Sequence, residues 1–175
     1  INKSFKEYVC NNNHISISAG ICINKPDEPV STVSEKSEYA IRKSKENQRD
    51  SITIFDEVVK WKEFTELHGI KSILELWLSK GYINNAMLFR MNHFLNMAKQ
   101  EKNLLTEKRA IDFDEMECFK WKAIFKYNLA RNIGKGLKEE EKKKAMKEVE
   151  KAAEWLTIYG GAMKIPIWQI IYNQR

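Results

Sequence analysis

The stretch from His14 to Phe55, HISISAGICINKPDEPVSTVSEKSEYAIRKSKENQRDSITIF, decides the fold of this 175-residue chain. Apolar residues occupy alternate positions from Ile15 to Ile23, which predicts a strand. Thr32 and Glu35 match a capping box, so we expect a helix to begin near Ser31 or Thr32 and to end at residues 47–50. A second apolar, β-branched run from Ile52 to Phe55 predicts another strand. The stretch therefore reads as strand, helix, strand.

The first predicted strand has small residues on its second face, Ser16, Ser18, Gly20 and Cys22. Small side chains allow another group to approach closely, and a glycine within a strand often marks such an approach. Either a packed helix or a ligand fits this face, and the pattern does not choose between them.

The pattern becomes helical after Phe55. Residues 1–9 also have helical spacing, but the main helical region runs from Asp56, with helices expected at 56–67, 70–78, 84–98, 114–131 and 138–156 and a short last helix containing Pro166. We expect breaks at Gly69 and Gly81, a loop over residues 100–111, and the deepest burial in the helix 114–131. The predicted fold class is α+β, with a strand–helix–strand domain over residues 1–55 and an all-α helical bundle over residues 56–175.

Composition sets broad limits. The chain carries a net charge of +6, which permits an anionic partner without identifying one. No apolar run approaches the length of a membrane span, so we expect no membrane partner. Cys10, Cys22 and Cys118 lack metal-ligand spacing and are interpreted as reduced core thiols of a cytoplasmic protein. Because Ile1 falls inside an apparent helix, the chain is expected to be a fragment or a processed piece.

The sequence offers no catalytic constellation. His14, His68 and His93 are far apart, so no metal site is predicted, and phosphate-cradling or nucleophile motifs are absent. The acidic residues Asp112, Asp114 and Glu115 are explained by helix capping rather than catalysis.

Aromatic and basic residues alternate in the helical region, a composition that suits single-stranded nucleic acid. The five tryptophans lie on helical stripes, however, and core packing is the better account for most of them. Arg131 and the loop Gly134–Lys135–Gly136 form a positively charged site at a helix end, which can bind phosphates.

The opening stretch resembles the closing part of GGDEF-type nucleotidyl cyclases, whose last helix is written A-D-x-A-L-Y-x-A-K-x-x-G-R-N. Here Ser37-Glu38, Ala40-Ile41, Ser44-Lys45 and Arg49-Asp50 stand at the matching positions, while Glu38, Arg42 and Gln48 depart from the pattern. Together with SITIFDEVVKW at 51–61 and WKAIFKYNLARN at 121–132, the chain is more similar to the large subunit of type III-A CRISPR effector (Csm) complexes, in which a second cyclase-like palm domain of ferredoxin-like fold precedes a helical domain.

This resemblance implies an antiviral, RNA-guided function. The intact subunit of that family makes cyclic oligoadenylates from ATP when target RNA binds, and it cleaves single-stranded DNA with an HD nuclease domain. ATP and Mg²⁺ or Mn²⁺ are the implied cofactors of the intact protein, and guide RNA, target RNA and other subunits, including the small subunit that the helical domain resembles, are the implied partners.

The resemblance also implies roles for four residues of this chain. Lys45, assisted by Arg49, takes the place of a lysine at the nucleotide phosphates, and Ser16 and Ser18 line the nucleotide side of the strand. The sequence contains neither a GGDD nor an HD motif, so no catalytic or metal-binding residue is assigned and the chain by itself is expected to be inactive, with no cofactor bound. The alternatives are a non-catalytic helical scaffold or RNA-binding module and a degenerate GGDEF regulatory domain.

Overall fold

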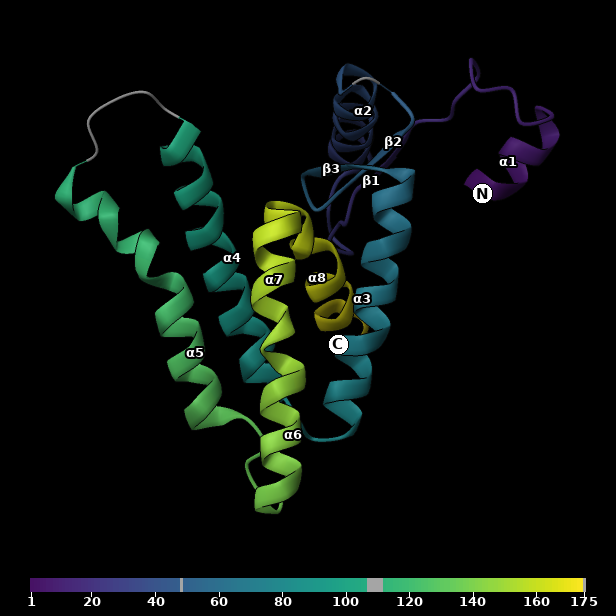
Figure 1. The fold of residues 1–175 in the computed structure, drawn as a ribbon. Coiled ribbons are helices and arrows are strands. Elements are labelled where there is room, and N and C mark those ends of the chain that lie inside the picture. Colours follow the sequence, from purple (N-terminus) through teal and green to yellow (C-terminus); the bar gives the residue numbers. More distant parts are fainter. Residues whose placement is uncertain (48, 107–111, 175) are drawn as a thin grey trace. The chain divides into compact units, whose positions relative to one another are not determined.

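The computed structural model describes residues 1–47, 49–106 and 112–174, and its helices and strands are labelled in Figure 1. The chain divides into two compact units, Ile1–His68 and Gly69–Arg175. A small sheet in the first unit and a helical second unit confirm the α+β class. The predicted domain ranges, 1–55 and 56–175, stay a prediction.

The first unit is built around a three-stranded sheet. Its elements in chain order are α1 (Asn2–Tyr8), β1 (Ala19–Ile21), α2 (Val30–Glu46), β2 (Ser51–Ile54) and β3 (Glu57–Lys60). The strand order is β1-β2-β3, with β1 parallel to β2 and β2 antiparallel to β3. Helix α2 is the crossover between the two parallel strands, which confirms the predicted strand–helix–strand.

Two boundaries of this motif differ from the prediction. Strand β1 covers three residues instead of Ile15–Ile23, because the short β2 pairs only with Ala19–Ile21. Helix α2 begins at Val30 with Pro29 as its N-cap and has no side-chain cap bond. The predicted Thr32–Glu35 capping box is therefore wrong, since the helix starts directly after Pro29 and Thr32 already lies inside it.

Residues 56–60 are also not the start of a helix. Phe55 and Asp56 adopt left-handed backbone angles, with φ of 53° and 67°, and form the two-residue connection of a β-hairpin. Two left-handed residues are what a tight hairpin requires, because this turn follows the right-handed twist of its strands. The β-branched pair Val58 and Val59 then continues as β3.

Helix α3 (Trp61–Ser79) follows and runs without interruption through Gly69, so the predicted break there is wrong. A glycine inside a helix costs only about 1 kcal/mol relative to alanine. Buried side chains on both sides of this glycine offset that cost: Leu67, Ile70, Leu74 and Trp77.

The second unit is helical. Its further elements are α4 (Asn85–Thr106), the 3₁₀ segment η1 (Phe113–Lys120), α5 (Trp121–Asn132), α6 (Glu139–Val149), α7 (Lys151–Tyr159), the 3₁₀ segment η2 (Gly160–Met163) and α8 (Lys164–Asn173). Residues 100–106 belong to α4, which corrects the predicted loop; its remaining part, 107–111, lies outside the described residues.

Helix starts in this unit follow the predicted capping. The side-chain oxygen of Asn84 accepts a hydrogen bond from the backbone N–H of Met87 at 3.0 Å. Asp112 and Glu115 form a capping box at the start of η1, which confirms the structural interpretation of these two acids. The side chain of Asp114 lies outside the described residues.

Aromatic packing forms the core of the second unit. Trp77 stacks on Trp155 with ring centroids 5.3 Å apart, and Phe94 meets the edge of Phe125 at 5.3 Å. Trp77 and Trp121 are almost fully buried, as expected for core tryptophans. Helix α5 is buried along one stripe only, whereas α8 buries five of its ten residues against α4 and η2. The expectation that the helix 114–131 is the most buried is therefore wrong.

Helix α2 lies unusually close to β1 at Gly20. A Cβ atom at this position would lie 2.5 Å from the backbone nitrogen of Ile41 and 2.8 Å from the Cβ of Ala40. Because backbone atoms of a helix cannot move aside independently, only glycine fits here. The close approach predicted for the small face of the first strand is thus made by a helix.

We expect Gly20→Ala to destabilise the first unit by about 1–3 kcal/mol, since the added methyl group forces α2 away from the sheet. Gly69→Ala is the matched control, because no atom lies within 4 Å of its added Cβ and alanine favours the helix by about 0.5–1 kcal/mol. Urea unfolding followed by circular dichroism measures both. Equal stability of the Gly20→Ala and wild-type proteins would contradict the close packing.

Candidate phosphate-binding edge of the sheet

The four residues predicted to bind a nucleotide come from segments that meet at one edge of the sheet. Ser16 and Ser18 precede β1, Arg49 precedes β2, and Lys45 lies in the last turn of α2. Parallel strands begin at the same edge, so the segments before β1 and β2 lie together. Ser16, Lys45 and Arg49 are exposed, and Ser18 is half-buried. Their contact with a nucleotide stays a prediction.

Hydroxyl groups fix the end of α2 to this edge. The Ser44 hydroxyl donates to the carbonyl of Ala19 at 2.7 Å and lies 2.6 Å from the Thr53 hydroxyl. Ser44 has one hydroxyl hydrogen, so Thr53 donates to Ser44, which donates to Ala19. The Ser51 hydroxyl donates to the backbone carbonyl of Ser44 at 2.8 Å. These three side chains are buried, and their mutual hydrogen bonds offset the cost of removing them from water.

Lys60 holds the turn that carries Arg49. Its ammonium donates to the carbonyl of Arg49 at 2.7 Å and to that of Asn47 at 3.2 Å. Arg49 and Asp50 have φ angles of 55° and 46°, a conformation that costs free energy for residues other than glycine and needs such support. Sequence reasoning missed Lys60 because it placed residues 56–67 in a helix; the β-branched pair Val58–Val59 was the available signal.

At this edge only the cationic side chains attract an anion, because the backbone at the end of α2 repels it. The C-terminal end of a helix carries partial negative charge, which repels phosphate and attracts cations. Lys43 and Lys45 lie in this last turn, and Lys43 donates to the carbonyl of Asp56 at 3.0 Å. Within the described residues the Lys45 ammonium has no assigned ion-pair partner, so it can turn toward a phosphate. Lys45 and Arg49 therefore have the chemistry and exposure that a triphosphate requires.

The described residues also include side chains that can serve as metal ligands. Among the described residues, however, no group of three or more His, Cys, Asp or Glu side chains could hold a metal ion. We therefore derive no chemical step through a metal.

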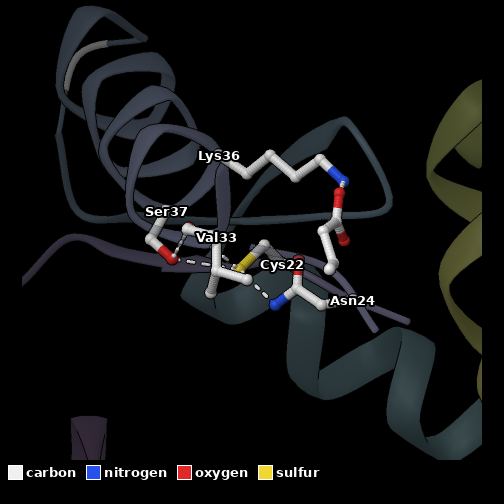
Figure 2. A network of polar contacts seen from close by, with 6 residues as sticks. Cys22, Asn24, Val33, Lys36 and Ser37 are labelled. Carbon is white, nitrogen blue, oxygen red and sulfur yellow. Dashed lines mark hydrogen bonds and ion pairs between the residues drawn. The ribbon is translucent and has the colours of Figure 1, made fainter. Parts of the chain in front are cut away.

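Cys22 lies at the opposite end of the small face and forms a second polar cluster. Figure 2 shows its sulfur between Ser37 and Asn24, with Val33 of α2 beside them. The Ser37 hydroxyl is 3.0 Å from the Cys22 Sγ and 2.8 Å from the Val33 carbonyl, so it can donate to either. The Asn24 amide donates to the sulfur at 3.4 Å. Hydrogen bonding from Ser37, and then from Asn24, lowers the pKa of the Cys22 thiol below its ordinary value.

The other two cysteines occupy different environments. Cys118 is buried, and burial raises the pKa of its thiol. Cys10 is exposed, which corrects its interpretation as a core thiol: it follows α1, a helix with no buried residue. All three thiols are free.

Comparison with known proteins gives one match. Residues 1–53 match the family model described as Cas10/Cmr2, second palm domain. The matched part contains β1 and α2 and ends inside β2, and it supports the interpretation of this part as a piece of a Cas10-type large subunit. It covers less than a third of the chain, so the helical region is without a family assignment. No curated protein and no solved structure matches the chain significantly.

We expect Cys22 to be alkylated faster than Cys118 at neutral pH, because its lowered pKa gives more thiolate. The rate should rise with pH and reach half its maximum below the pH expected of an ordinary thiol. In Ser37→Ala the midpoint should move upward, since the largest stabilising hydrogen bond to the thiolate is gone. Iodoacetamide labelling followed by peptide mass spectrometry measures each site. An unchanged midpoint in Ser37→Ala would rule out this hydrogen bond as the cause.

Proposed function

We propose that this chain is the C-terminal part of the large subunit of a type III-A CRISPR effector (Csm) complex. The match of residues 1–53 to the second palm domain of Cas10/Cmr2 is the observation that carries the proposal. In the intact subunit this palm makes cyclic oligoadenylates from ATP when target RNA binds, while a separate HD domain cleaves single-stranded DNA. The complex acts in the cytoplasm, and no described helix has the length and apolarity that a membrane span needs.

The fold supports this proposal in two ways. The small sheet with its β1-α2-β2 unit is consistent with a fragment of a palm, and a helical unit follows it. We propose that this helical unit packs against neighbouring subunits, including the small subunit, along the guide–target duplex. Contacts of that kind read backbone charge and shape and leave the bases to pair with each other.

Lys45 and Arg49 are the residues that we propose to act on ATP. An ammonium beside a triphosphate offsets negative charge and fixes the orientation of the phosphates. Arg49 adds a second cation from the turn that Lys60 holds, and Ser16 and Ser18 offer hydroxyl donors before β1. The Mg²⁺ or Mn²⁺ that accompanies ATP would bind to a GGDD motif elsewhere in the intact subunit.

The second candidate function is a non-catalytic helical scaffold or RNA-binding module, in which the sheet is structural. The exposed basic residues of α5 favour this function. A degenerate GGDEF regulatory domain is the weaker alternative, because a helical unit of this size is not expected after such a domain.

In the intact large subunit, Lys45→Ala should reduce cyclic oligoadenylate synthesis by about tenfold or more, the effect of losing one charge-assisted hydrogen bond. Single-stranded DNA cleavage should change little. Lys36→Ala is the matched control, because Lys36 lies in the same helix, is exposed and pairs with Glu28. Chromatography of the products formed from ATP with target RNA measures synthesis. If Lys45→Ala and Lys36→Ala behave alike, Lys45 is an ordinary surface lysine.

The 175-residue chain alone should form no cyclic oligoadenylate from ATP, Mg²⁺ and target RNA, because its sequence has no GGDD motif. The same product assay with the intact subunit is the positive control. Robust synthesis by the isolated chain would overturn the division of roles proposed for the palm.

A further inference from the structure

All of the net positive charge of this chain is concentrated in one short segment. Residues 119–138, FKWKAIFKYNLARNIGKGLK, contain six lysines and arginines and no acidic residue. The net charge of the whole chain is also +6, so the other residues carry 24 basic and 24 acidic side chains in balance. The segment runs from the last two residues of η1 through α5 and the following loop to Lys138, the N-cap of α6.

The cations of α5 lie along its exposed side. The apolar stripe of the helix, Trp121, Phe125 and Leu129, is buried. The outer stripe consists of the exposed residues Lys122, Ala123, Lys126, Tyr127, Ala130 and Arg131. Lys122, Lys126 and Ala130 recur every four residues, as do Ala123, Tyr127 and Arg131, so they form two adjacent rows along about three turns of helix. The short side chains of Ala123 and Ala130 leave space between the longer side chains of the stripe.

Tyr127 is the exposed aromatic residue at the centre of the outer stripe. The residue is 59% exposed, so its ring is accessible to a ligand. The Arg131 guanidinium donates to the Tyr127 hydroxyl at 2.7 Å and lies 5.5 Å from the ring centroid. One face of a tyrosine oriented in this way is available for stacking.

Only weak contacts within the protein compete for these cations. Lys126 lies 3.0 Å from Glu150, but both side chains are largely exposed, and such pairs contribute at most about 1 kcal/mol. Lys122 lies over the ring of Trp121 with its ammonium 5.6 Å from the centroid. A polyanion can replace these contacts at little cost.

The loop after α5 extends the stripe. The backbone N–H of Gly134 donates to the carbonyl of Tyr82 at 3.2 Å, and Gly134 is buried. The loop is thus attached to the second unit at its first glycine, while Lys135 beside it is exposed. Lys135 adds a further cation just beyond the Arg131 end of α5.

We propose that the outer stripe of α5, extended by Lys135, binds single-stranded RNA, with phosphates at Lys122, Lys126, Arg131 and Lys135 and one base stacked on Tyr127. A row of cations without acids is complementary to a phosphate backbone, and an exposed aromatic ring provides the stacking surface that single strands offer and duplexes do not. The choice of RNA over DNA rests on the proposed function, whereas the choice of a single strand rests on Tyr127.

Fluorescence anisotropy with a labelled oligouridine and the whole chain tests the charge. The variant Lys122→Glu with Arg131→Glu should weaken binding by at least tenfold and reduce the slope of log K against log salt by about 1.4, as expected for two lost contacts to a single strand. The control Lys143→Glu with Lys147→Glu makes the same change in net charge on exposed positions of α6. Equal weakening by both double variants would overturn the site.

Substitution of Tyr127 tests the stacking. Tyr127→Ala should weaken binding by roughly 5- to 150-fold, the measured range for one stacked base, at every salt concentration. Tyr127→Phe keeps the ring and should bind nearly as well as the wild type, and circular dichroism confirms that each variant folds. No loss in Tyr127→Ala, or an equal loss in Tyr127→Phe, would overturn the role of the ring.

Competition with unlabelled nucleic acids tests the partner. Oligouridine should compete better than double-stranded RNA or oligodeoxythymidine of the same length. Better competition by either of these would overturn the proposed partner. Failure of RNA binding leaves the assignment of the palm intact, because that assignment is measured by oligoadenylate synthesis and its dependence on Lys45.

Discussion

The close approach of α2 to β1 at Gly20 is the constraint on which the first unit depends. With no Cβ between them, the helix backbone lies directly on the strand, and Ser44 reaches the carbonyl of Ala19. Hydroxyl groups of Ser51 and Thr53 then complete a buried polar contact with the end of α2. This contact fixes where α2 ends, and therefore where Lys45 and the following turn lie.

Local patterns predicted the parts of the fold that local physics controls. Alternating isoleucines marked the first strand, small residues marked a close approach, and Asn84 and Asp112 marked helix starts. The hairpin was missed because Val58 and Val59 fit a strand or a helix equally well by spacing, and only their β-branched side chains favoured a strand. These two residues form a strand because they pair with β2, and that pairing is a tertiary contact that local spacing does not reveal.

In the candidate site, too, some residues could be predicted from the sequence and others could not. Lys45, Arg49, Ser16 and Ser18 came from a resemblance, and the topology brings their segments to one edge of the sheet. The supporting contacts came only from the structure, because a lysine that bonds two carbonyls of a distant turn leaves no periodic signal. On α5, spacing predicted the burial of Trp121 correctly, but only the observed exposure of Tyr127 distinguishes it from the aromatic residues of the core.

The end of the family match at residue 53 falls within β2, whose partner β3 and whose supporting Lys60 come later in the chain. The segment that matches the family model is therefore shorter than the segment that folds. A chain cut at that point would lose the β2–β3 hairpin and expose a new edge of β2. It would also lose Lys60, which holds the strained turn that carries Arg49. The end of the family match and the end of the sheet differ here by at least seven residues, the distance from residue 53 to Lys60.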